Sequence, residues 1–325
     1  MKLQQLRYVW EVAQHGLNIS ATAESLFTSQ PGVSKQIRLL EDELGVQIFA
    51  RSGKHLTHIT PAGRTIVEMA GHILQEANNI KRAAQEYRDE KRGTFAVATT
   101  HTQARYWLPL RIAEFMRRYP EVRLQMHQGT PQQIGQMAAQ GQVDVAIATE
   151  SLDSYEDLVM LPLYQWNRSV VVPQGHDLAR AGAPLTLEAL VGYPIITYVS
   201  GFTGRSQLDR AFEARHLRPN VVFTAADADV IKCYVKLGLG VGVVANMAID
   251  PETDSSLVAL DARHLFPTST TRLALRRHTF LRRFTYDFLL LLAPHLTRDR
   301  VDAAMNARSQ EEVDAMFAKL PLPVM

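Results

Sequence analysis

Hydrophobic residues near the start of the chain recur at helical spacing, in three short segments separated by turns. The apolar positions of the first segment are Leu3, Leu6, Val9, Trp10 and Ala13. Because they lie mostly three or four residues apart, they form one face of a helix, which we expect to end near Gly16. Ser20 is a candidate N-cap for a second helix that runs to Leu26.

The third segment predicts a helix with an apolar face and a polar face. Ser29 is a candidate N-cap, and Pro31 lies in the first turn, where its missing N–H costs little. The apolar face consists of Val33, Ile37, Leu40 and Leu44, and the polar face of Gln30, Ser34, Lys35 and Arg38. A short helix, a tight turn and a helix with a polar face are typical of a helix-turn-helix. The alternative is a small three-helix domain whose polar face only meets water.

A hairpin is predicted after this helix. Two apolar stretches, residues 46–49 and 56–59, flank a basic tip that contains Arg51, Gly53 and Lys54. A wing of this kind lies near the DNA backbone, where Arg and Lys contact phosphates without reading the base sequence. The residues that we expect to contact DNA are Ser29, Gln30, Pro31, Ser34, Lys35, Arg38, Arg51 and Lys54.

A long helix is predicted after Thr60 and Pro61, an N-cap followed by proline at the first helical position. It carries two interleaved series with seven-residue spacing, which are Ile66, Ile73 and Ile80 and then Ala70, Ala77 and Ala84. Heptad spacing favours a helix that pairs with a second copy of itself, and such pairing places two DNA-binding heads side by side. Packing of this helix on its own domain is the alternative.

Strands and helices alternate from residue 93 onward. The expected strands cover residues 94–98, 122–127 and 143–148, and the expected helices cover residues 105–119 and 132–139. This alternation predicts an α/β domain with a mostly parallel sheet. Ligands of such sheets gather at the carboxyl ends of the strands.

Hydroxyl groups stand beside free backbone N–H groups at three of the predicted strand ends: residues 99–103, Thr149 and residues 201–206. This combination suits a small anion such as sulfate or a carboxylate. Each threonine taken alone is explained better by helix capping, but three such segments in one sheet favour a binding site. Asp227 and Asp229 form a close acidic pair, which we interpret as the start of a helix.

The composition predicts a folded, cytoplasmic protein. Hydrophobic residues make up 46% of the 325 positions, and the formal net charge of +2 says little about partners. A single cysteine, Cys233, rules out an intrachain disulfide framework and favours a reducing compartment. The start of the chain lacks the features of a secretory signal, and the longest dense apolar run, residues 288–293, is too short to span a bilayer. We therefore expect no membrane contact.

The sequence motifs resemble those of a known family. Residues 22–45, TAESLFTSQPGVSKQIRLLEDELG, followed by Ile48, Phe49, Arg51 and the TPAG of residues 60–63, resemble the LysR-type transcriptional regulators. Other segments resemble, within this family, regulators that activate cysteine biosynthesis and sulfur assimilation. These segments are TTHTQARY (99–106), YEDLVMLP (155–162), WNR (166–168), GFTGRS (201–206), DADVIK (227–232) and APHLTR (293–298). The resemblance covers nearly the whole chain.

The resemblance implies a domain organisation and a set of partners. It implies a winged helix-turn-helix over residues 1–59, a dimerising linker helix over residues 60–92 and an effector-binding domain over residues 93–325. The effector domain would have two α/β lobes like a periplasmic binding protein, lobe I over residues 93–164 and 266–325 and lobe II over residues 165–265. Promoter DNA in double-stranded form, a second copy of the chain, a homotetramer and RNA polymerase are the implied partners.

The resemblance also implies an anionic effector, such as sulfate, O-acetylserine or N-acetylserine. Its contacts carry over to Thr100, Thr102, Gln103, Thr149 and Thr203, with Trp166 as a wall of the site. Ser200 stands where an aromatic residue is expected and Trp107 where alanine is expected, so the preferred ligand stays open. A close relative that controls sulfonate or sulfate-starvation genes fits nearly as well.

A solute-binding receptor and an enzyme on the same scaffold are the rival classes. A receptor needs an export signal and has no use for residues 1–60. An enzyme needs a nucleophile, a metal site or an acid–base pair, and we find no nucleophile elbow, phosphate-binding loop or set of metal ligands in the sequence. We therefore expect no enzymatic activity, no metal and no cofactor other than the effector.

Overall fold

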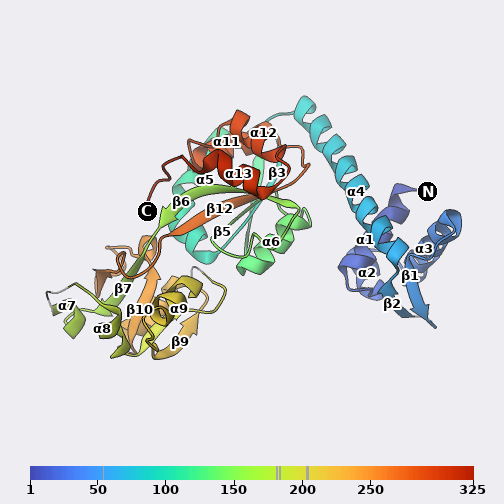
Figure 1. Cartoon of the computed structure of the whole chain (residues 1–325). Coiled ribbons are helices and arrows are strands. Elements are labelled where there is room, and N and C mark those ends of the chain that lie inside the picture. Colours follow the sequence, from blue (N-terminus) through green and yellow to red (C-terminus); the bar gives the residue numbers. More distant parts are fainter. Residues whose placement is uncertain (54, 181, 183, 203–204) are drawn as a thin grey trace. The chain divides into compact units, whose positions relative to one another are not determined.

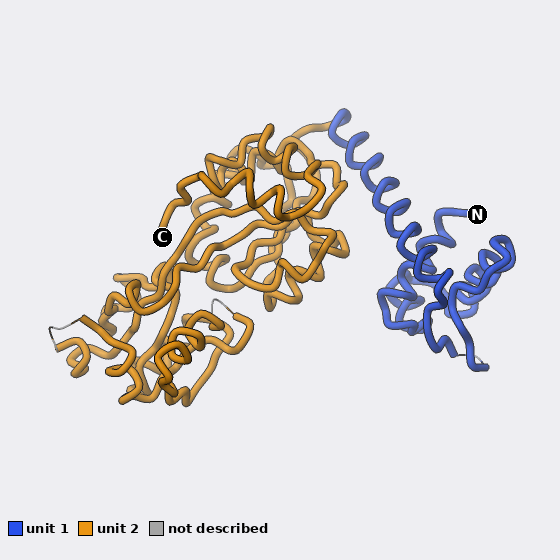
Figure 2. Tube along the Cα trace, in the orientation of Figure 1, with its two compact units in different colours: residues 1–88 blue, residues 89–325 orange. Residues whose placement is uncertain are grey.

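The computed structural model describes residues 1–53, 55–180, 182, 184–202 and 205–325, so the predicted roles of Lys54 and Thr203 lie outside the described residues. The chain forms two compact units, residues 1–88 and residues 89–325 (Figure 2). The first unit is helical with a small hairpin, and the second contains two five-stranded sheets (Figure 1). Within the described residues, every helix is too short or too polar to cross a membrane.

The first unit contains three short helices, a hairpin and one long helix. They are α1 (Leu3–Gln14), α2 (Ile19–Ser25), α3 (Gln30–Leu44), β1 (Phe49–Ser52), β2 (His55–Ile59) and α4 (Pro61–Arg88). The prediction of Ser20 as the cap of α2 is wrong, because the side chain of Asn18 accepts the hydrogen bond from Ala21 N instead. Helix α3 begins after Ser29 as predicted, and it ends at Gly45, whose φ of 70° lies in the left-handed region.

Half of the long helix α4 packs on its own unit. Ala70 is buried, and Gly71 lies so close to the ring of Trp10 that a Cβ there would meet a ring atom at 2.5 Å. The alternative of packing on its own domain therefore holds for this part of the helix. Further along, Ile73 is 40% exposed and Ile80 is 71% exposed. The later part of the heptad series thus presents apolar side chains at the surface.

Lobe I is built around the sheet with strand order β4-β3-β5-β12-β6. Its strands are β3 (Gly93–Thr99), β4 (Val122–Gln128), β5 (Val145–Ala148), β6 (Leu158–Trp166) and β12 (Ser269–Arg276). Its helices are the π-helix η1 (Gln103–Trp107), α5 (Pro109–Arg118), α6 (Pro131–Ala139), α11 (Arg283–Leu292), α12 (Arg298–Met305) and α13 (Gln310–Phe317). One predicted helix, residues 105–119, is in fact η1 followed by α5, because Pro109 begins a new helix.

Side-chain size determines which helices cover which face of this sheet. In β3, Phe95 and Val97 pack with Phe115 of α5 and Phe288 of α11, because alternate residues of a strand point to the same face. The intervening alanines of β3 point to the other face, which α6 covers (Figure 1). The large residues of β3 therefore pack against α5 and α11 on one face of the sheet, and its alanines pack against α6 on the other face.

Lobe II repeats this plan with the strand order β11-β7-β10-β8-β9. Its strands are β7 (Arg168–Pro173), β8 (Ile195–Tyr198), β9 (Val221–Ala225), β10 (Val241–Ala245) and β11 (Leu257–Asp261). Its helices are α7 (Asp177–Arg180), α8 (Leu187–Val191), α9 (Arg205–Glu213), α10 (Ala228–Lys236) and the 3₁₀-helix η2 (Asn246–Ala248). Asp227 caps α10 by accepting a hydrogen bond from Val230 N, which confirms that the acidic pair starts a helix.

The chain crosses between the two sheets twice. The first crossing is at Asn167, between β6 and β7, and the second lies between β11 and β12. In lobe I, β12 runs antiparallel to both β5 and β6, and in lobe II β7 runs antiparallel to both β10 and β11. The single sheet expected from the sequence is therefore two sheets, in each of which four strands run in one direction and only the strand that follows a crossing, β12 or β7, runs in the opposite direction.

Candidate functional site

Helix α3 presents the polar face that the sequence predicts. Val33, Ile37 and Leu40 are fully buried in the core of the first unit, so the opposite face of the helix points outward. Ser29 is exposed and caps the helix, where its hydroxyl accepts a hydrogen bond from Gly32 N at 3.3 Å. The residues at the start of α3 are thus held in a fixed helical geometry while their side chains stay accessible.

A groove of about 440 Å³ lies between this helix face and the hairpin. It is lined by Gln30, Pro31, Ser34, Lys35, Arg38, Leu39 and Arg51. Six of these seven residues are among those that the sequence predicts to contact DNA. The structure therefore brings the predicted set together on one surface, with three basic side chains around amide and hydroxyl groups.

Arg51 has a partner inside the protein, which the sequence analysis did not foresee. Its guanidinium donates to Glu41 Oε2 at 3.0 Å, and the two side chains are only 19% and 9% exposed. The other oxygen of Glu41 accepts hydrogen bonds from Ile48 N at 2.9 Å and Phe49 N at 3.1 Å. These bonds hold the entry of the hairpin against α3, and they explain why β1 begins at Phe49 rather than at residue 46. Arg51 is thus a support of the hairpin as well as a lining residue of the groove.

The predicted effector residues of lobe I lie at the carboxyl end of β3. Thr100, Thr102 and Gln103 are 7%, 1% and 2% exposed. Gln103 Oε1 accepts a hydrogen bond from the hydroxyl of Tyr164, which is itself buried in the lobe I core. These side chains therefore line the interior of the domain rather than its surface.

Thr102 has a buried hydroxyl without a hydrogen bond of regular geometry in the described part of the chain. The hydroxyl of Tyr198, from lobe II, lies near the Thr102 hydroxyl, and the interaction between the two acts to lower the pKa of Tyr198. Burial raises the pKa of Tyr198 to about 12, so this neighbour is neutral at physiological pH. A buried polar atom that lacks a partner is costly, and it marks a place where a ligand or a water is expected.

Thr149 and Trp166 are in contact with each other. Thr149 Oγ1 lies 3.3 Å from Trp166 Nε1, which donates to it, and 3.2 Å from Thr271 Oγ1. Trp166, which the resemblance predicts as a wall of the site, has a side chain that is fully buried in the lobe I core beneath Thr149. Its indole N–H fixes the orientation of the threonine, and its ring supports the crossing at Asn167.

A cavity of about 760 Å³ opens between the lobes beside Thr149. It is lined by Thr149, Glu150, Ser151, Leu152, Asp153, Met160, Gly201, Ser206, Gln207, Arg210, Thr268, Ser269, Thr270, Arg272, Gln310 and Asp314. Of the predicted effector residues that the structure describes, Thr149 alone lines it. Ser206 of lobe II donates to Glu150 Oε1 of lobe I at 2.8 Å, so a direct hydrogen bond crosses this cavity. The sequence analysis missed Glu150, because a lone acidic residue after a strand gives no signal.

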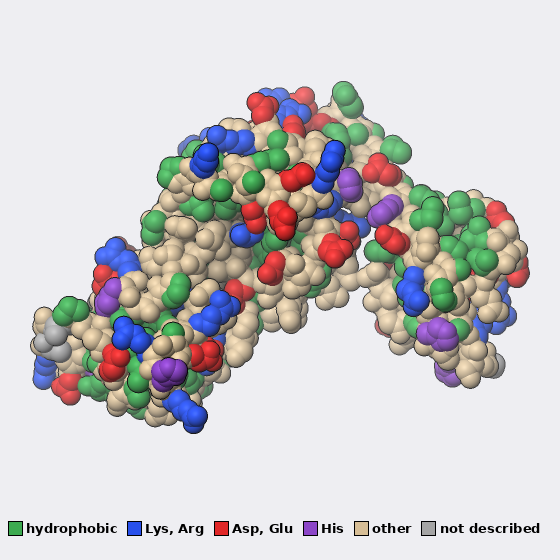
Figure 3. Space-filling view, viewed as in Figure 1, with side chains coloured by type: hydrophobic (Ala, Val, Ile, Leu, Met, Phe, Trp, Pro, Cys, Tyr) green, Lys and Arg blue, Asp and Glu red, His purple; other side chains and the backbone are tan. Residues whose placement is uncertain are grey.

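On the face of the second unit that Figure 3 shows, acidic and basic side chains do not form separate patches. There, acidic and basic side chains are mixed over both lobes.

In the described residues, one group has the spacing that a metal ion needs, namely His101, Asp227 and Asp229, whose ligand atoms lie within 4.8 Å of one another. Arg105 Nε is 3.3 Å from Asp229, and this existing positive charge disfavours a second cation there.

These features define a DNA-binding regulator with a two-lobed ligand-binding domain. Residues 3–64 match the family described as the bacterial regulatory helix-turn-helix protein, lysR family, and residues 88–297 match the LysR substrate binding domain. The chain belongs to the LysR family of transcriptional regulators, and it is not an enzyme. The family and the fold class expected from the sequence are confirmed.

The chain is similar to named regulators over nearly its whole length. It is 49% identical over 322 residues to the HTH-type transcriptional regulator CysB of Haemophilus influenzae, which covers 99% of each chain. It is 50% identical over 301 residues to the HTH-type transcriptional regulator SsuR of Burkholderia cenocepacia, over 93% of this chain and 97% of that one. Identity to the regulator cbl of Escherichia coli is 43% over 314 residues, with 97% and 99% covered.

Solved structures give the same fold. The crystal structure of the cofactor-binding domain of the Cbl transcriptional regulator is 42% identical, with a TM-score of 0.64 over 67% of this chain and 96% of that chain. A full-length OxyR variant from Pseudomonas aeruginosa is 26% identical, with a TM-score of 0.64 over 89% of this chain and 96% of that chain.

The Arg51–Glu41 pair generates a testable prediction. Arg51→Met keeps the aliphatic stem and removes the charge, which leaves the nearly buried Glu41 carboxylate without its cation. We expect the opening free energy of the hairpin to fall by about 1–3 kcal/mol. Hydrogen exchange of residues 48–52 in the full-length protein measures this change. Arg38→Met, an exposed arginine on the same groove, is the control, and equal exchange in both variants would contradict the supporting role.

Proposed function

We propose that the protein is an activator of genes for sulfur assimilation and cysteine biosynthesis that responds to a small anionic effector, such as sulfate, O-acetylserine or N-acetylserine. The observation that supports this most strongly is the buried hydroxyl of Thr102 near the carboxyl end of β3, which faces Tyr198 of lobe II without a hydrogen bond of regular geometry. The similarity to regulators named CysB, SsuR and Cbl over nearly the whole chain supports the choice of sulfur metabolism.

The proposed DNA-binding surface is the groove beside α3. Gln30, Ser34 and Lys35 stand on the outward face, where amide, hydroxyl and ammonium groups can donate to base edges in the major groove. Ser29, Pro31 and Arg38 lie near the same surface, and Arg51 and Lys54 are assigned to the phosphate backbone. The organisation that we propose is a head of residues 1–59, a linker of residues 60–92 and an effector domain of residues 93–325.

The proposed effector site lies between the lobes. Thr100 directly follows β3, Thr102 and Gln103 lie at the start of the helical segment after it, and Thr149 directly follows β5. Thr203 is the proposed contact from lobe II, and Trp166, whose indole donates to Thr149, is the proposed wall of the site. The lobes are residues 93–164 with 266–325 and residues 165–265. An anion that contacts both lobes stabilises the closed form over the open form only because it makes more favourable contacts in the closed form.

Assembly and location complete the proposal. The exposed Ile73 and Ile80 of α4 are the heptad positions through which we expect a second copy to pair, and a homotetramer follows from two such dimers. The proposed partners are promoter DNA in double-stranded form and RNA polymerase, in the cytoplasm. Light scattering of the full-length protein tests the assembly, and a monomer at micromolar concentration would contradict it.

A second candidate function is control of sulfonate or sulfate-starvation genes. It is supported by the nearly equal identity of the chain to CysB at 49% and to SsuR at 50%. Transcript levels in a deletion strain distinguish the two candidates. Loss of cysteine-biosynthesis transcripts on sulfate supports the first, and loss of transcripts only during growth on a sulfonate supports the second.

The DNA-binding surface generates a prediction for Lys35. Lys35→Ala should weaken operator binding by about 1–3 kcal/mol and reduce discrimination against mismatched DNA, because a lysine at the groove donates to base edges. Lys81→Ala, on the exposed surface of α4, removes the same charge away from the groove and serves as the control. Fluorescence anisotropy at fixed salt measures both. Unchanged discrimination in the Lys35 variant would contradict the assignment.

The effector site generates a prediction for Thr102. Thr102→Val keeps the shape of the side chain and removes the buried hydroxyl, so the fold should remain and affinity for the anion should fall about 10- to 100-fold. Calorimetry with sulfate and N-acetylserine measures the affinity. Thr94→Val, at the exposed start of β3, is the matched control. Wild-type affinity of the Thr102 variant for both ligands would place the site elsewhere.

A further inference from the structure

A buried lysine of lobe II obtains one of its hydrogen-bond acceptors from lobe I. Lys232, on α10, is 3% exposed. Its Nζ donates to Asp254 Oδ2 at 2.6 Å, to Ala248 O at 2.7 Å and to Tyr106 Oη at 2.9 Å. The first two acceptors belong to lobe II, whereas Tyr106 lies on η1 of lobe I. Because an ammonium has three N–H donors, all three are satisfied only while the lobes are together.

The hydroxyl of Tyr106 bridges two charged groups of lobe II. It accepts from Lys232 and donates to Asp229 Oδ1. Burial and the hydrogen bond to Asp229 raise the pKa of Tyr106, so the hydroxyl keeps the proton that it donates. Burial acts to lower the pKa of Lys232, but its hydrogen bonds to Asp254 and Tyr106 raise it above its ordinary value. The ammonium and the phenol therefore remain in these protonation states at physiological pH.

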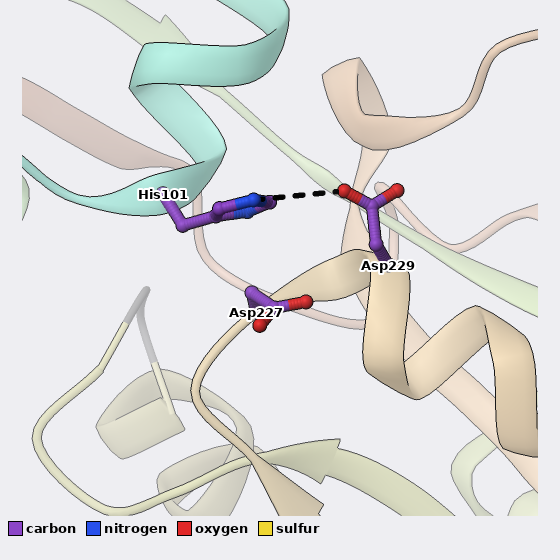
Figure 4. A group of neighbouring side chains, drawn as sticks. All are labelled: His101, Asp227 and Asp229. Atoms are coloured by element: carbon purple, nitrogen blue, oxygen red, sulfur yellow. Dashed lines mark ion pairs between the residues drawn. The ribbon is translucent and has the colours of Figure 1, made fainter. Parts of the chain in front are cut away.

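Two further residues of lobe I lie against the same carboxylate. Arg105 Nε is 3.3 Å from Asp229 Oδ2, and His101 Nε2 is 3.8 Å from it. Figure 4 shows His101 pointing from the helical turn before η1 toward Asp229 at the start of α10. Asp229 thus contacts three residues of one short lobe I segment, residues 101–106, and Tyr106 makes the most buried of these contacts.

Apolar packing supports the same junction. The ring of Tyr106 packs against the lobe II cluster that includes Tyr198 and Ile231. In the other direction, Met247 of lobe II packs against the lobe I cluster, and its sulfur lies 3.8 Å from the hydroxyl oxygen of Tyr164. Each lobe therefore inserts a side chain into the apolar surface of the other.

A metal ion is the other occupant that this geometry allows. His101, Asp227 and Asp229 together offer three ligand atoms (Figure 4). However, Lys232 and Arg105 already place two positive charges within 3.5 Å of the Asp229 carboxylate. Repulsion from these cations disfavours a divalent ion, and the hydrogen-bonded arrangement needs none.

We propose that Tyr106, Asp229 and Lys232 form a latch that holds the two lobes closed and sets the effector concentration at which the protein responds. The segment that carries the latch directly follows Thr102 and Gln103, so the proposed effector contacts and the latch move as one piece of lobe I. The effector threshold rests on the proposed function, but the holding of the lobes does not depend on any ligand.

The latch acts on the equilibrium between the closed and the open arrangement of the two lobes. Opening the lobes removes Tyr106 from Lys232 and Asp229, and it leaves one donor of a buried ammonium without its partner. A weaker latch therefore raises the population of the open form. An effector that binds the closed form then has an apparent affinity reduced in proportion to the closed fraction.

The first experiment measures the lobes without ligand. Spin labels at Glu213→Cys of lobe II and Asp299→Cys of lobe I, in a Cys233→Ser background with excess unlabelled protein, report the distance between the lobes by double electron–electron resonance. Tyr106→Phe should raise the ratio of open to closed protein about tenfold, which corresponds to about 1.4 kcal/mol. Tyr286→Phe is the matched control, because its hydroxyl donates to Asp302 within lobe I.

A second variant removes the acceptor on the other side of the same hydrogen bond. Asp229→Ala should shift the distances in the same direction if Tyr106→Phe does not fold, and the double variant should shift by less than the sum of the two single variants, because both remove the hydrogen bond between Tyr106 and Asp229. Equal distance distributions in wild type and Tyr106→Phe would overturn the latch. A wild-type distribution that EDTA shifts toward the open form, and that Zn²⁺ restores, would overturn it in favour of a metal clamp.

The effector arm separates this inference from the proposed function. Calorimetry with sulfate should show affinity about two- to tenfold weaker in Tyr106→Phe and unchanged in Tyr286→Phe. If wild-type protein binds neither sulfate nor N-acetylserine, the proposed effector fails, while the ligand-free distances still decide the latch. If both ligands bind and Tyr106→Phe shifts the distances without changing affinity, the latch does not set the threshold.

Discussion

The guanidinium of Arg168 lies where the chain passes from one lobe to the other, and the geometry of the second unit depends on it. It donates to Pro267 O at 3.1 Å and to Ser269 Oγ at 3.0 Å, so it joins the first crossing to the second. Its charged group also lies 4.9 Å from the centre of the Trp166 ring. Burial lowers its pKa to about 10, which still leaves it charged at neutral pH. The indole of Trp166 in turn holds Thr149, so the crossing and the proposed effector site share one support.

A similar arrangement connects function to folding in the first unit. The carboxylate of Glu41 collects two backbone N–H groups and the guanidinium of Arg51, and it thereby fixes the hairpin against α3. Lys35 stands outside this network, on the accessible face of the same helix. The groove therefore combines side chains that are free to meet DNA with one that is already engaged in holding the wing. Because the hairpin is already held by Glu41 and Arg51, little conformational entropy remains to be lost there when the first unit binds DNA.

The sequence predicts those parts of the site that depend on local pattern. The outward face of α3 follows from the spacing of Val33 and Ile37, and the threonines after β3 follow from their place at a strand end. Glu41 lies four residues after Ile37 and so shares the buried face, but the sequence analysis considers only apolar residues for that face and therefore misses it. The contact between Tyr106 and Lys232 joins residues 126 positions apart, and no local pattern indicates such a pair.

The position of the effector is the central claim, since the cavity of about 760 Å³ between the lobes offers a competing location with its own arginines. Selenate has the shape and charge of sulfate, and its anomalous scattering locates it in a crystal without reference to a built ligand. Diffraction data from crystals of the full-length protein soaked in selenate therefore provide the most direct test. The account predicts a selenium peak whose oxygens lie within hydrogen-bond distance of Thr102 Oγ1. A peak only beside Arg210 or Arg272 in that cavity would contradict it.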